Sequence, residues 1–306
     1  MRSWPASVTP EQSGRTTLLA TLVLVALAAC WGSTFFLIKD LLDRVPTLDF
    51  LAVRFSIAAV ALLVVAPRAI ARLSPTVRRH AVVLGLLYGV AQILQTNGLA
   101  HTPASISGFV TGLYVVCTPL LAAAILRTRI PPVTWVAVAL ATIGLGVLAL
   151  RGLSVGYGEM VTLASAVLYA LHIVGLGAWS TARDAVGMTI LQVIVIALVC
   201  TTATAYDGIV LPTRTGYWVS LAYMAVVVGA AGLLGQTWAQ AHLPPTRTAI
   251  IMSMEPVFAS FFAVWLGGED LTRRLLLGGS MVLVAMLIVE LAPRRVVEGE
   301  VPHIAV

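Results

Sequence analysis

Long apolar runs separated by short polar connectors fill the chain from about residue 17 to residue 292. Most runs reach the roughly 20 residues that an α-helix needs to cross about 30 Å of hydrocarbon. The longest connectors, 39–47, 67–80 and 205–216, are too short for a soluble domain. The pattern therefore predicts an all-α polytopic membrane protein with about ten transmembrane helices. We place these helices at residues 17–38, 48–66, 81–99, 104–126, 133–150, 157–178, 186–204, 217–236, 247–267 and 274–292.

Polar positions inside these runs recur at a fixed spacing. Gln95 and His101, together with several of their neighbours, recur as Gln236 and His242 at a constant offset of 141 in the numbering. A spacing of 138 relates the spans before them in the same way. Such self-similarity indicates that the chain contains two copies of one structural unit.

The repeat has a consequence for membrane topology. Each copy holds five predicted spans, and an odd number of spans makes the second copy enter the membrane in the opposite orientation. We therefore expect two inverted five-helix repeats, at residues 17–150 and 157–292. In secondary transporters built this way, the substrate site lies near the membrane midplane between the repeats.

Several short motifs in fixed order add a family resemblance. The motifs are WGSTFFLIK (31–39), SISGFVTGLYVVCTPLL (105–121), GEMVTLASAVLYALHIV (158–174) and the run 236–270, which contains MEPVF and GGED. With these motifs the chain resembles the EamA family of the drug/metabolite transporter superfamily over about residues 17–292, which implies a ten-helix secondary transporter rather than an enzyme.

The two copies differ at one helix end. The first copy reads LRTRIPP at 126–132, where the second reads LGGEDLT at 266–272. The first copy therefore lacks the acidic residues of the second at the matching terminus.

Composition and charge agree with a membrane protein. The chain of 306 residues is 59% hydrophobic and only 10% charged, whereas soluble domains are about 25% charged. The net charge of +6 comes from arginines in short loops, a pattern that favours a cytoplasmic position for those loops and not nucleic-acid binding. Counting Lys and Arg on alternate sides gives twelve against six. We therefore expect the protein in the plasma (inner) membrane, with both termini on the cytoplasmic side.

Cysteines and catalytic motifs point to no further chemistry. Cys30, Cys117 and Cys200 lie within apolar runs, so we expect neither a disulfide framework nor a metal site. No zinc-protease, nucleophile-elbow or P-loop motif is present. We expect no cofactor.

Glu255 lies near the middle of an otherwise uncharged span. An ionisable group at this depth is costly in lipid, which leaves two interpretations. Either Glu255 faces a cavity, where it binds a proton, a cation or a polar group of a solute, or neighbouring helices satisfy it by hydrogen bonds. His172 is a second candidate for proton coupling, since the unperturbed pKa of histidine is about 6.5. A hydrogen-bonded core histidine is the alternative. Pro256 follows Glu255, and we match it with Pro119 in the fourth span as a pair of hinges.

Amides and aromatic residues inside the spans are the other candidates for a solute cavity. Amides both donate and accept hydrogen bonds, which suits neutral or zwitterionic solutes. Helix-to-helix hydrogen bonding and ordinary core packing are the alternatives. The predicted cavity set is Trp31, Gln92, Gln95, Tyr114, Tyr169, Gln236 and Glu255.

Arg54 lies six residues into the second span. At that depth a long side chain can extend toward the lipid headgroups. We interpret it as a structural or gate residue, with Glu159 as a candidate ion-pair partner.

Together these features favour a secondary transporter that exports a small metabolite or drug-like solute by alternating access. The alternative is an intramembrane enzyme or lipid-handling protein that uses Glu255 and His172 as acid and base. Expected partners are a small organic solute and membrane lipid. Protons and a second copy of the chain, as a homodimer, are further candidates, and nucleic acid is not expected.

Overall fold

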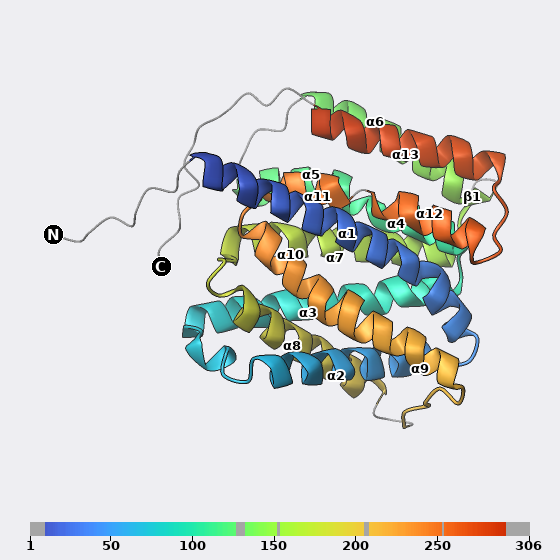
Figure 1. Ribbon diagram of the computed structural model, residues 1–306. Helices are drawn as coiled ribbons and strands as arrows, with labels where there is room; N and C mark the ends of the chain where they lie inside the picture. The colour runs from blue at the N-terminus through green and yellow to red at the C-terminus, as the bar shows by residue number, and fades with distance from the viewer. Residues whose placement is uncertain (1–9, 127–131, 152–153, 205–207, 253, 292–306) are drawn as a thin grey trace.

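The computed structural model describes residues 10–126, 132–151, 154–204, 208–252 and 254–291 (Figure 1). Within them, each predicted span is formed by one helix or by two or three helices that follow one another along the chain. The predicted end of the last span, residue 292, lies outside the described residues. The first half contains α1 (Pro10–Leu42), α2 (Thr47–Val65), η1 (Ile70–Arg72), α3 (Pro75–Ala100), α4 (Ala104–Gly112), α5 (Tyr114–Leu126) and α6 (Pro132–Ala149). The second half contains α7 (Tyr157–Trp179), α8 (Ala185–Thr204), α9 (Thr215–Ala222), η2 (Tyr223–Ala231), α10 (Gly232–Gln240), α11 (Pro245–Met252), α12 (Glu255–Trp265) and α13 (Arg273–Leu291).

By length and composition, seven helical stretches among the described residues can each cross a membrane, and two more apolar helices are shorter. The prediction of an all-helical membrane protein is therefore confirmed. One small addition is a two-residue hairpin between the halves, in which β1 (Leu150–Arg151) pairs antiparallel with β2 (Ser154–Val155). Another is the π-helical geometry of η2, which joins α9 and α10 into one continuous span.

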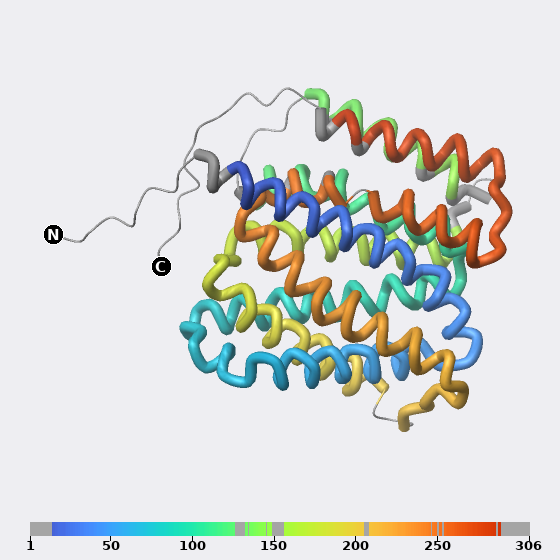
Figure 2. Tube along the Cα trace, viewed as in Figure 1, coloured from blue at the N-terminus to red at the C-terminus, as the bar shows by residue number. Residues whose placement is uncertain are grey.

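The packing of the halves follows the repeat. Helices at equivalent positions lie along one another: α6 along α13, and α2 along α8 (Figure 1). In the fourth and ninth spans the pairing is crosswise, because α4 packs on α12 and α5 packs on α11. Crosswise pairing requires these two spans to run antiparallel, as an inverted repeat does. The chain trace in Figure 2 also shows α10 of the second half beside α1 of the first.

Small residues allow the closest of these approaches. A Cβ atom added to Gly108 in α4 would lie 2.6 Å from the Cβ of Ala259 in α12. A Cβ added to Gly32 in α1 would lie 2.9 Å from the backbone oxygen of Glu255. Close backbone contact is how helices associate in lipid, where hydrophobic burial supplies no driving force. Both contacts fix the position of α12.

Candidate solute cavity between the repeats

Two helical spans break at the same level of the repeat. In the fourth span, α4 ends at Gly112 and α5 begins at Tyr114. In the ninth span, α11 ends at Met252 and α12 begins at Glu255, 141 residues after Tyr114. The interruption at Leu113 is slight, because its N–H bonds to the Val110 oxygen and its own oxygen accepts from the N–H groups of Val116 and Cys117.

The prolines do not coincide with both breaks. Pro256 lies in the first turn of α12, where its missing N–H group leaves no helix hydrogen bond unmade. Pro119 lies inside α5, five residues beyond Tyr114. The predicted matching of the two prolines is therefore wrong, because Tyr114 occupies the position equivalent to Glu255. A hinge role for Pro119 or Pro256 stays a prediction.

The two breaks meet at a hydrogen bond between the repeats. The Tyr114 hydroxyl donates to Glu255 Oε2 at 3.1 Å and lies 2.9 Å from the backbone oxygen of Met252. That oxygen belongs to the last turn of α11, where helix carbonyls lack intrahelical donors. Glu255 is only 6% exposed. Its carboxyl group is thus held at the junction of the two halves.

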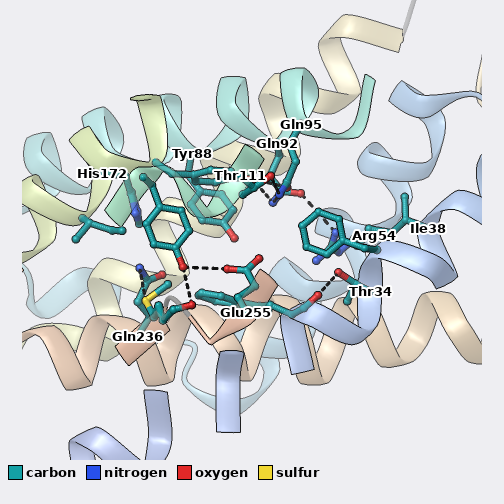
Figure 3. A pocket seen from close by; sticks show the side chains of 16 residues that line it. Thr34, Ile38, Arg54, Tyr88, Gln92, Gln95, Thr111, His172, Gln236 and Glu255 are labelled. Carbon is teal, nitrogen blue, oxygen red and sulfur yellow. Dashed lines mark hydrogen bonds between the residues drawn. The ribbon is translucent and has the colours of Figure 1, made fainter. Parts of the chain in front are cut away.

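These breaks border a narrow cavity with a volume of about 40 Å³ (Figure 3). All seven residues of the predicted cavity set line it, and so does His172. The full lining is Trp31, Thr34, Phe35, Ile38, Arg54, Tyr88, Gln92, Gln95, Thr111, Tyr114, Tyr169, His172, Ile173, Gln236, Met252 and Glu255.

Most of the lining residues are related by the repeat. Twelve of the sixteen form six pairs, at the spacing of 138 on the first and sixth spans and at the spacing of 141 farther on. The cavity therefore lies where the two repeats face each other. The pairs are Trp31 with Tyr169, Thr34 with His172, Phe35 with Ile173, Gln95 with Gln236, Thr111 with Met252, and Tyr114 with Glu255.

Amides and hydroxyls form a connected network on one side of the cavity. Gln92 Nε2 donates to the Tyr169 hydroxyl at 2.6 Å, and that hydroxyl donates to Gln95 Oε1 at 2.8 Å. Gln95 Nε2 in turn donates to Thr111 Oγ1 at 3.2 Å. Because Tyr169 belongs to the second half, the network joins the repeats. On the other side, Gln236 Nε2 donates to Gln240 Oε1 at 3.1 Å.

Arg54 points into the cavity and not toward the membrane surface. It is 3% exposed, and its guanidinium donates to the backbone oxygen of Met224 at 3.2 Å and to Gln92 Oε1 at 3.4 Å. It also lies 5.1 Å from the centre of the Phe55 ring. In the described part of the chain it forms no ion pair with Glu159. Both the expected reach to the headgroups and the expected partner are therefore wrong.

His172 and Glu255 line the same cavity but have different partners. A ring nitrogen of His172 lies 2.9 Å from Gln192 Oε1, and Gln192 is the repeat equivalent of Arg54. The carboxyl group of Glu255 accepts from Tyr114. In Figure 3, His172 and Gln236 lie on the opposite side of Glu255 from Arg54.

Sequence reasoning missed half of the lining. Thr34 lies one helical turn after Trp31 and is the repeat equivalent of His172, so the constant spacing of the repeat identifies it once His172 is chosen. Thr111 lies three residues before Tyr114 on the same side of the fourth span. The missed residues are Thr34, Phe35, Ile38, Arg54, Tyr88, Thr111, Ile173 and Met252.

Paired helix breaks around a cavity between inverted membrane repeats define a transporter architecture. The sequence pattern of the EamA-like transporter family matches residues 18–150 and again residues 156–291. The chain belongs to this family, which is part of the drug/metabolite transporter superfamily.

Two individual proteins show how far the likeness extends. The chain is 27% identical over 279 residues to a protein of Archaeoglobus fulgidus described as an uncharacterized transporter, covering 90% of this chain and 86% of that protein. A crystal structure with 20% sequence identity covers 92% of this chain and 98% of its own, with a TM-score of 0.67. The second likeness concerns the fold alone.

Proposed function

We propose that this membrane transporter is a secondary transporter that exports a small metabolite or drug-like solute by alternating access. The observation that supports the proposal most is the cavity, whose lining is shared between the repeats and borders both helix breaks. In alternating access, one repeat moves against the other around a central site. A site built from both repeats changes its exposure when they move.

The cavity lining favours a solute with polar groups and an apolar or flat part. Amides, hydroxyls and Arg54 present donors and acceptors, whereas Phe35, Ile38 and Trp31 present apolar surface. Arg54 and Glu255 are buried opposite charges, and no ion pair joins them in the described residues. A solute that carries both a hydrogen-bonding head and an apolar body satisfies both kinds of surface.

We also propose the plasma membrane as the location, with both termini cytoplasmic, from the distribution of arginines. A reporter that fluoresces only in the cytoplasm, fused after Val306, is then bright. A dark fusion expressed at normal levels contradicts the orientation.

The experiment for transport has two stages. Cells that overproduce the protein are screened for tolerance to metabolites and antibiotics, and a labelled form of each protective compound is then loaded into liposomes containing purified protein. We expect the compound to cross the bilayer chemically unchanged, at a rate that falls in a Gln95→Ala variant. Thr142→Ala is the matched control, because Thr142 is exposed and bonds to a carbonyl of its own helix.

Two results contradict the proposal. If the compound is recovered as a converted product, the cavity is an intramembrane active site. If Gln95→Ala and Thr142→Ala transport equally well, the solute does not pass through this cavity.

A further inference from the structure

The connector between α3 and α4 is held by an acidic side chain from the other half of the chain. After α12 the backbone turns at Gly268, whose φ of +70° suits glycine, and brings Glu269 to the start of α4. Glu269 Oε1 accepts from the Ala104 N–H at 2.5 Å, and Oε2 accepts from the N–H and hydroxyl of Ser105 at 3.2 and 2.5 Å.

This contact is a helix cap supplied from a distance. The first N–H groups of any helix lack intrahelical partners and carry partial positive charge. Pro103, the N-cap residue of α4, makes no side-chain cap. The Glu269 carboxyl group therefore satisfies α4 donors that the local sequence leaves unpaired.

A basic side chain holds the other end of the same connector. Lys39, in the last turn of α1, donates through Nζ to the backbone oxygens of Thr102 at 2.6 Å and Leu99 at 3.3 Å. Leu99 lies in the last turn of α3 and Thr102 lies just beyond its C-terminal end, where a cation is favourable. We call Lys39, Glu269 and residues 99–105 the clamp. It lies where α1 and α3 end and α4 begins, and Ile38, next to Lys39 in α1, is a lining residue of the cavity.

In the sequence, neither charged residue of the clamp recurs at the equivalent position of the other repeat. By the two repeat spacings, Gly177 stands for Lys39 and Thr128 for Glu269, so neither charge recurs. Thr128 lies outside the described residues. Pro245 stands for Ala104 and has no N–H to donate. Gly177 instead packs against the Pro245 ring, where an added Cβ would overlap it. At the positions equivalent to Lys39 and Ala104, the described residues are thus in apolar contact.

We infer that the clamp holds one end of the cavity closed and that Glu269 sets the balance between the two access states. This inference rests on the proposed alternating access. With cytoplasmic termini, the clamped end is extracellular, because α1 and α12 both end there. Opening that end separates Glu269 from α4, so the bonds of Glu269 stabilise only the state that is closed outside. Removing them shifts the population toward the outward-open state.

Side-specific labelling of one cavity cysteine tests the inference without any knowledge of the solute. In a background where Cys30, Cys117 and Cys200 are replaced by Ala, Thr34→Cys places a reporter thiol on the lining. A membrane-impermeant maleimide is applied to intact cells and to inside-out vesicles. We expect Glu269→Gln to raise the labelling rate from outside roughly tenfold, the effect of about 1.4 kcal/mol, and to lower the rate from inside.

Two further variants divide the clamp into its parts. Ser105→Ala removes one of the three hydrogen bonds to Glu269, and Lys39→Met removes the cap on α3. Both raise outside labelling by less than Glu269→Gln does. The matched control is Asp270→Asn, which removes an equal charge from an exposed neighbour and leaves the ratio of outside to inside labelling unchanged.

The inference is overturned if Glu269→Gln leaves that ratio unchanged, or if labelling rises equally from both sides, because a cap that only supports folding gives those results. If Glu269→Gln does not insert, Ser105→Ala decides, and an unchanged ratio in that variant overturns the inference. A failure to find a transported solute leaves the labelling result intact, so the two proposals fail separately.

Discussion

The two repeats contribute the same positions to the cavity but different chemistry. At two matched places the residues are similar: Gln95 and Gln236 are identical, and Trp31 and Tyr169 are both aromatic. At others they differ in charge: Tyr114 faces Glu255, and Arg54 on the lining corresponds to Gln192, which lies behind His172. The difference separates two roles of the lining. The shared positions define the shape of the cavity, and the residues that break the symmetry supply its charge.

The hydrogen bonds follow the same division. The amides Gln92 and Gln95 bind to Tyr169, and Gln92 also accepts from Arg54. Arg54 donates to one amide oxygen and one backbone carbonyl oxygen, and Glu255 accepts from the Tyr114 hydroxyl. Burying a charge without an opposite charge is expensive in a membrane. We therefore expect Arg54 and Glu255 to be the groups whose contacts change when a solute or a proton binds.

Glu255→Gln has the largest expected effect on transport. Glutamine keeps the shape of the side chain and can still accept from Tyr114, but it cannot exchange a proton. We expect the rate in liposomes to fall at least about tenfold and its dependence on pH to disappear. Insertion and the thermal unfolding midpoint in detergent stay close to those of the parent. The measurement is solute flux at several pH values.

Tyr114→Phe is the matched control for Glu255. It removes the hydroxyl that donates to Glu255 but keeps the titratable carboxyl group. We expect it to lower the rate and to retain a pH dependence. A Glu255→Gln variant with the parent's pH profile shows instead that Glu255 is a structural hydrogen-bonding residue.

Arg54→Gln installs the residue of the other repeat and has the next largest effect. It removes the arginine of the cavity lining and its bond to the Met224 carbonyl. We expect transport of an anionic or zwitterionic solute to fall more than transport of a neutral one, by about three- to tenfold. Because a buried charge without an ion-pair partner costs free energy, the thermal midpoint does not drop much. Equal loss for all solutes contradicts a role in selecting charge.

The spans and much of the cavity could be predicted from the sequence because two signals coincide. Apolar runs of about 20 residues define the helices, and polar residues inside such runs are rare enough to stand out. Gln95, Gln236 and Glu255 are each polar within a span, and Gln95 and Gln236 also recur in the repeat.

The rest depends on three-dimensional packing. The break at Leu113 contains no proline and so has no sequence signal, and the hinge of this span was predicted at Pro119 instead. The direction of Arg54 was not predictable, because its depth alone is compatible with an outward or an inward side chain. Tyr88 resembles any core aromatic in sequence, and only the approach of α3 to α7 places it on the lining.

Gly108→Val tests the contact that holds the two repeats together beside the cavity. Its first added carbon would lie 2.6 Å from Ala259 Cβ, so α4 and α12 must separate. We expect the free energy of unfolding to fall by about 1–3 kcal/mol, as overpacking does, and transport to fall with it. The control is Gly216→Ala in α9, where nothing lies within 4 Å of the added carbon. Similar unfolding midpoints for the two variants contradict the close contact.

Trp31→Phe has the smallest expected effect and concerns the best-matched aromatic pair. Trp31 Nε1 donates at 3.1 Å to the backbone oxygen of Val228 in the π-helical segment η2. Its equivalent Tyr169 bonds to the amide network instead. Phenylalanine keeps an aromatic ring on the lining and removes one neutral hydrogen bond, so the loss is about 1 kcal/mol. Thermal unfolding in detergent measures it.

Tyr169→Phe is the comparison: because it disconnects Gln92 and Gln95 across the repeats, it lowers transport more than Trp31→Phe does. If the two variants have equal transport rates, the network that joins the repeats does not contribute to transport, and the two aromatics serve only as matched walls of the cavity.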